Sequence, residues 1–155
     1  MAFYPCVDNA KLTELLDGSI TSIYSSTPTL RNSAFRGASN LVNVDLPELT
    51  AVSNTAFYDC TNLEFLDFPK VSSIQVSAFG YTKLKTLILR RNSVVTLINI
   101  NSFIYTPFGN TGTGGKLYVP QSLISAYQNN ATWASLLSQN ANNQILAIEG
   151  SPYEI

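Results

Sequence analysis

One six-residue block recurs four times along the chain, and this internal repeat limits the possible folds more than any other feature. It reads SAFRGA at residues 33–38, TAFYDC at 55–60, SAFGYT at 77–82 and NSFIYT at 101–106. The four phenylalanines, at positions 35, 57, 79 and 103, therefore follow one another at intervals of 22, 22 and 24 residues. A unit of this length cannot bury its own apolar face, so the units must stack and share one elongated core.

A second pattern, L-x-x-L-x-L, follows each of the first three blocks. It occupies residues 41–46, 63–68 and 84–89, and a partial copy ends in the sequence LYVP at 117–120. This is the spacing of a leucine-rich repeat, in which each coil contributes a short strand that pairs in parallel with the next. We therefore predict a leucine-rich-repeat solenoid, mainly β, with about four coils of 22–24 residues and short helical caps at both ends.

The repeat also predicts which side chains point inward. One buried ladder should run through residues 44, 66, 87 and 117, and a second through 46, 68, 89 and 119, beside the phenylalanines. Small residues at Ala38, Cys60, Thr82 and Thr106 should form another, which makes Cys60 a packed core thiol. We expect a further ladder five residues before each phenylalanine, at Leu30, Val52, Ile74 and Ile98.

The ends of a solenoid need caps that are apolar inside and polar outside. We assign residues 1–18 to an N-terminal cap, 19–120 to the solenoid, 121–150 to a C-terminal helical cap and 151–155 to a loose tail. In the C-terminal cap we expect a helix from Pro120 to about Asn129, a second helix from Trp133 to Ser138 with Thr132 as its N-cap, and a closing strand from Ile145 to Ile148. Trp133 is expected to cover the last coil.

Composition excludes several functional classes. The chain has no histidine, two cysteines and a net charge of −1 with only nine Lys and Arg. The usual catalytic triads, a zinc site and a nucleic-acid interface are therefore not expected, nor is a cofactor. No apolar stretch is long enough to span a membrane, and no signal peptide is visible. The glycine-rich stretch 109–116 lacks the spacing of a phosphate-binding loop.

The combined motifs resemble the BspA-like leucine-rich-repeat family, over roughly residues 19–149. The features that match are the A-F-x-x-C block with Asn62-Leu63 after it, the strand that ends in proline, and the ending Leu117-Tyr118-Val119-Pro120 with Tyr127 and Trp133. The resemblance implies a bacterial, protist or bacteriophage protein, in most cases surface-exposed and adhesive, without a common catalytic site. Few coils and no visible signal peptide also fit a virion protein.

The side chains that point outward from the strands are the candidate partner-binding site. Phe65, Ile88 and Tyr118 are apolar at positions where the pattern expects solvent, so we expect either a partner, a terminal cap or a neighbouring subunit to cover them. Asp45 and Asp67 are interpreted as solvated residues rather than a catalytic or cation-binding carboxylate pair. The full candidate set is Asn43, Asp45, Phe65, Asp67, Thr86, Ile88, Lys116 and Tyr118.

Two functions fit this site. The first is a non-catalytic recognition or adhesion module that binds a protein or glycan on a cell surface. The alternative is a bacteriophage structural protein, a head fibre or tail decoration, that serves assembly or host attachment and forms a homo-oligomer. Both place the protein outside the cell, on a cell surface or on a virion.

Overall fold

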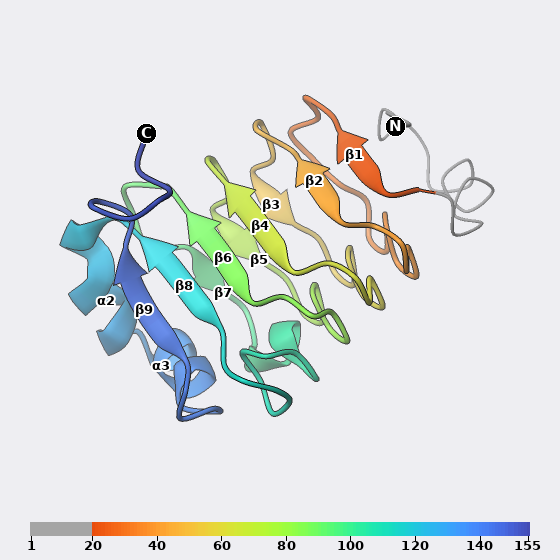
Figure 1. Ribbon diagram of the computed structural model, residues 1–155. Coiled ribbons are helices and arrows are strands. Elements are labelled where there is room, and N and C mark those ends of the chain that lie inside the picture. The colour runs from red at the N-terminus through yellow and green to blue at the C-terminus, as the bar shows by residue number, and fades with distance from the viewer. Residues whose placement is uncertain (1–19) are drawn as a thin grey trace.

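Parallel strands, one from each coil, form the front of the computed structural model, which describes residues 20–155 (Figure 1). β1 (Ser22–Tyr24) pairs with β2 (Asn43–Asp45). β2 lies against the next sheet, whose order is β4 (Phe65–Phe68), β6 (Thr86–Leu89), β8 (Lys116–Val119) and β9 (Gln144–Ala147). The solenoid predicted from the repeat is confirmed.

Two further sides close each coil. Behind the front strands lies a sheet of three very short strands, β3 (Ala51–Val52), β5 (Ser73–Ile74) and β7 (Thr96–Leu97). The phenylalanine blocks form the third side, where backbone N–H groups donate to the next coil; Phe35 N bonds Ala56 O and Phe57 N bonds Ala78 O, each at 2.8 Å. All three sides therefore link one coil to its neighbour through backbone hydrogen bonds.

Stacked apolar side chains fill the space between these sides. The rings of Phe35 and Phe57 are 5.4 Å apart, those of Phe57 and Phe79 6.0 Å, and those of Phe79 and Phe103 5.2 Å. The aliphatic ladders are buried as predicted, except that Val44 in β2 is only half-buried and Ile98 is exposed. One hydrophobic core thus runs through all the described coils.

The prediction for Ile98 was wrong. Leu97, not Ile98, pairs with Ile74 in the ladder and is buried, whereas Ile98 is 48% exposed. The reason is a 3-10 helix, η1 (Ile100–Phe103), whose N-cap Asn99 accepts from the backbone N–H of Asn101. This helix adds one residue between β7 and Phe103. The residue that points inward is therefore one position earlier in the sequence, at Leu97.

Short helices close the C-terminal end of the solenoid behind β8 and β9 (Figure 1). The 3-10 helix η2 (Gln121–Leu123) leads into α2 (Ile124–Asn129), and α3 (Ala131–Leu137) follows. The N-cap of α3 is Asn130 rather than Thr132, because the Asn130 Oδ1 accepts from the backbone N–H groups of Thr132 and Trp133.

Trp133, a residue of α3, covers the last coil as a lid. Its side chain is fully buried and its Nε1 donates to Val95 O at 2.7 Å. The expected N-terminal cap, residues 1–18, lies outside the described residues.

Candidate binding face

The outward side chains of the front strands form two adjacent rows, which we call the outer face. Parallel register aligns Phe65, Thr86, Lys116 and Gln144 in one row. It aligns Asp67, Ile88, Tyr118 and Leu146 in the other. Asn43 and Asp45 lie on β2, beyond β4, and are both exposed. The structure therefore brings the residues proposed from the sequence onto one face.

Tyr153, within the segment 151–155 that was expected to be a loose tail, packs against the middle of this face. The ring of Tyr153 lies 5.6 Å from Phe65 on β4 and 4.8 Å from Tyr118 on β8. Arg90 Nη2 also donates to Tyr153 O at 3.0 Å. The chain end is seen in Figure 1 returning over the carboxyl ends of β8 and β9.

Ile88 points outward from β6, where the sequence pattern expects solvent, and it is fully buried. It belongs to β6, between the two strands that Tyr153 bridges, and it is not part of the internal core. Tyr153 thus covers it from outside, which is the terminal-cover alternative for this position. Only its aromatic character distinguishes Tyr153 in the sequence, and this does not reveal where the chain returns.

Asp67 is held by an ion pair and is not available as a free carboxylate. Arg90 donates from Nε to Asp67 Oδ1 at 2.8 Å and from Nη2 to Oδ2 at 2.7 Å. The two side chains are only 17% and 30% exposed. Because both carboxylate oxygens accept from one guanidinium, a catalytic or cation-binding partnership of Asp67 with Asp45 is disfavoured. Within residues 20–155, no cluster of three potential metal ligands occurs.

An open hollow of about 690 Å³ lies on the N-terminal side of the covered region. The residues that line it are Val42, Asn43, Val44, Asp45, Asn62, Glu64 and Phe65. Phe65 is 40% exposed and Val42 49%. Phe65 therefore has Tyr153 on one side and open space on the other.

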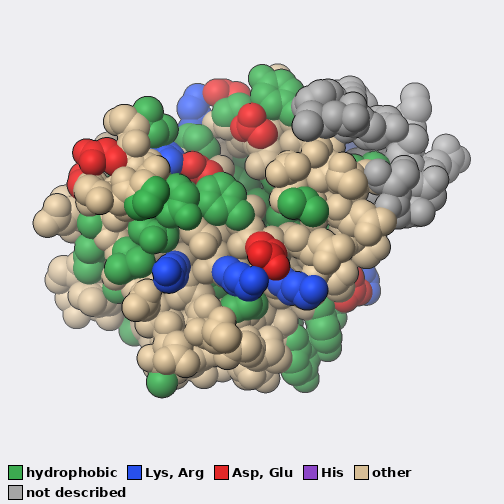
Figure 2. Space-filling model, viewed as in Figure 1, with side chains coloured by type: hydrophobic (Ala, Val, Ile, Leu, Met, Phe, Trp, Pro, Cys, Tyr) green, Lys and Arg blue, Asp and Glu red, His purple; other side chains and the backbone are tan. Residues whose placement is uncertain are grey.

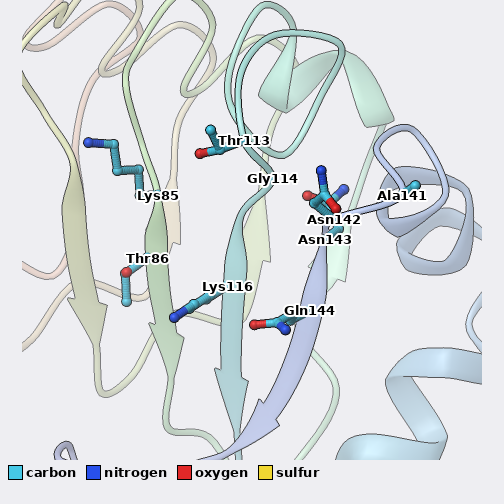
Figure 3. Close-up of a pocket in the computed structure, with 9 residues that line it drawn as sticks. All are labelled: Lys85, Thr86, Thr113, Gly114, Lys116, Ala141, Asn142, Asn143 and Gln144. Atoms are coloured by element: carbon cyan, nitrogen blue, oxygen red, sulfur yellow. The ribbon is translucent and has the colours of Figure 1, made fainter.

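A second hollow, of about 740 Å³, lies at the amino ends of β6, β8 and β9 (Figure 3). Thr86, Lys116 and Gln144 follow one another across the strands, with Lys85 and Thr113 beyond them. Of these, Thr86 and Lys116 were expected from the sequence, whereas the others come from loops and from β9, whose position the repeat does not predict.

The hydrogen bonds of Asn143 hold one wall of this second hollow in place. Its Nδ2 donates to the carbonyl oxygens of Phe108, Leu136 and Leu137, and its Oδ1 accepts from Gly115 N at 2.7 Å. Gly114 has φ +91°, and a Cβ there would lie 2.5 Å from the backbone of Asn142. Gly114 thus allows close packing against the chain before β9.

A family model for BspA-type leucine-rich repeat regions matches residues 3–129 in six copies. The chain belongs to the BspA-type leucine-rich repeat family. Such repeats typically form surface-binding or adhesion modules and are usually non-catalytic. Comparison with curated proteins and with solved structures finds no match. Among residues 20–155, no helix is long and apolar enough to cross a bilayer.

In this BspA-type chain the cysteine of the repeat block is a structural residue. Cys60 is completely buried and its Sγ donates to Phe35 O at 3.1 Å in the preceding coil. Burial raises the pKa of the thiol from 9.0 to about 12. Because the thiolate is the reactive form, Cys60 is unreactive at neutral pH. The outer face therefore remains the candidate site.

Proposed function

We propose that this BspA-type module is a non-catalytic recognition module that binds a protein or glycan on a cell surface through its outer face. The observation that carries the proposal is Phe65, an aromatic side chain on a paired strand that remains 40% exposed beside an open hollow. Rigid aromatic side chains in such positions commonly serve as anchors for a partner.

The construction of the face supports this proposal. Backbone hydrogen bonds fix the strands, and Tyr153 packs against Phe65 from one side. Figure 2 shows hydrophobic side chains gathered on this face beside a row of Lys and Arg. A partner would meet a preformed surface with both apolar and charged parts, so little conformational entropy would be lost on binding.

Binding of the labelled protein to whole bacterial and epithelial cells tests the proposal. We expect saturable binding that Phe65→Ser reduces strongly, because this change removes the exposed ring without touching the core. Ile98→Ser is the matched control, since Ile98 is 48% exposed and lies beyond β7. A phage or virion role would instead be indicated by a folded, symmetric oligomer that binds no cell. Equal loss with Phe65→Ser and Ile98→Ser would exclude the outer face as the site.

A further inference from the structure

The polar hollow at the amino ends of β6, β8 and β9 continues into a third hollow on the neighbouring edge of the solenoid. The third hollow measures about 410 Å³ and is lined by Tyr81, Tyr105 and Pro107 together with residues of the loop 111–113. Lys85 and Thr113 line both hollows. The two hollows therefore adjoin at these residues, and together they are called the groove.

Uncommitted hydrogen-bonding groups line the polar half of the groove. The side chains of Thr86, Thr113, Lys116, Asn142 and Gln144 all line this half. Within the described part of the chain, none of these five has a side-chain hydrogen bond or ion pair. Hydroxyls and amides offer both donors and acceptors, which is what a ligand rich in hydroxyl groups requires.

The groove has a positive charge. Lys83, Lys85 and Lys116 line its two halves, and none of the lining residues is acidic. Glu64 Oε1 lies 3.2 Å from Lys85 Nζ, and the charge of Asp59 acts on Tyr81. Three of the nine cations of the chain thus line a groove with two neighbouring acids, Glu64 and Asp59, and the excess of positive charge favours an anionic ligand.

The other half of the groove carries exposed aromatic rings. The rings of Tyr81 and Tyr105 are 4.7 Å apart and the side chains are 42% and 43% exposed. Tyr58 continues the row, 5.2 Å from Tyr81. Sugar rings present apolar C–H groups that pack against aromatic side chains, so this half suits a pyranose ring.

We propose that the groove binds an acidic polysaccharide, with carboxylates at Lys85 and Lys116 and a pyranose ring against Tyr81 and Tyr105. This inference rests on the proposed recognition function and names the ligand class. An acidic peptide fits less well, because extended peptides bind to free strand edges and β6 and β8 are each paired on both sides.

The test is calorimetric titration of the protein with polygalacturonate at low salt, with neutral dextran and polyglutamate as reference polymers. We expect polygalacturonate to bind more tightly than either, with an affinity that falls as salt rises. Lys85→Gln and Lys116→Gln should each weaken binding by about tenfold, as for the loss of a charge-assisted hydrogen bond. Tyr105→Asn should also weaken it, and asparagine tolerates the positive φ of 54° at this position.

Lys70→Gln is the matched control for Lys85→Gln. Each lysine pairs with a glutamate, Glu48 or Glu64, and the two lysines are 53% and 54% exposed. Unchanged binding in Lys70→Gln and weaker binding in Lys85→Gln supports the groove. Equal weakening in both, or equal binding of polyglutamate and polygalacturonate, overturns the inference in favour of non-specific charge attraction.

The same variants separate this inference from the proposed function. If the protein binds cells through Phe65 but does not bind polygalacturonate, the ligand class is wrong and the recognition function stands. If polygalacturonate binds in the groove and no cell is bound, the groove is confirmed and the cell-surface function is wrong.

Discussion

Replacement of Phe79 by alanine tests the stacked core most directly. Phe79 is fully buried, and its ring lies 5.2, 6.0 and 6.5 Å from those of Phe103, Phe57 and Phe68. Truncation of a buried phenylalanine costs about 3–5 kcal/mol, and loss of three ring pairs places this site in the upper part of that range. The loss is a large fraction of the roughly 5–15 kcal/mol that holds a typical domain together.

Urea unfolding followed both by circular dichroism and by Trp133 fluorescence measures this effect. Trp133 reports on the C-terminal end, since its ring is 6.1 Å from Phe103, whereas circular dichroism reports on all coils. We expect the two probes to shift together, because the coils share one core.

Phe35→Ala serves as the comparison at the other end of the stack. Phe35 is equally buried but has one ring neighbour within residues 20–155, Phe57, so its replacement should cost less than that of Phe79. A Phe79→Ala protein that unfolds within about 1 kcal/mol of the original would refute the stacked-core argument, since only a poorly packed site tolerates such a change.

Three further predictions concern single contacts. Asn130→Ala should cost about 1 kcal/mol in urea unfolding by removing the N-cap of α3, and Thr132→Ala should be nearly neutral. Tyr153→Ser should cost about 2 kcal/mol and increase binding of a hydrophobic dye by uncovering Ile88, whereas Ile155→Ser, at a fully exposed position, should do neither. The raised pKa of Cys60 contributes stability to the folded protein that is fully present below pH 9 and is lost as the pH rises from about 9 to 12, because only the thiol of the unfolded protein ionises in this range. The free energy of unfolding should therefore decrease more between pH 7 and pH 10.5 for the original protein than for Cys60→Thr.

The repeat predicts the core because residues that lie one period apart in the sequence occupy equivalent positions in successive coils. Phe35, Phe57 and Phe79 lie one coil apart in the sequence and stack in the structure. When equivalent coils pair through their backbones, one register buries all of these phenylalanines. The inward and outward positions of the front strands follow from the same alternation.

The repeat fails where the coil length changes. Leu97 and Ile98 are adjacent aliphatic residues within the 24-residue spacing that ends at Phe103, so either could occupy the inward position. The choice depends on η1, a local 3-10 helix whose start is set by the side chain of Asn99. No period of 22 residues can reveal this insertion.

The candidate site was only partly predictable for a related reason. Phe65, Thr86 and Lys116 belong to strands, so the alternation assigns them to the outer face. Tyr153 and Asn142 reach the same face from segments that are not part of the repeat. Their positions depend on tertiary contacts, such as the hydrogen bond between Arg90 and the carbonyl of Tyr153.

The position of Tyr153 limits how this protein can change its length. Its ring contacts Phe65 on β4 and Tyr118 on β8, which are separated by two strand spacings of about 4.8 Å each. Insertion of one more coil between β4 and β8 would widen this separation to about 14 Å, too far for one ring to touch both partners. The two contacts of Tyr153 therefore fix the number of coils between β4 and β8. Coils could be gained or lost before β4 without disturbing these contacts.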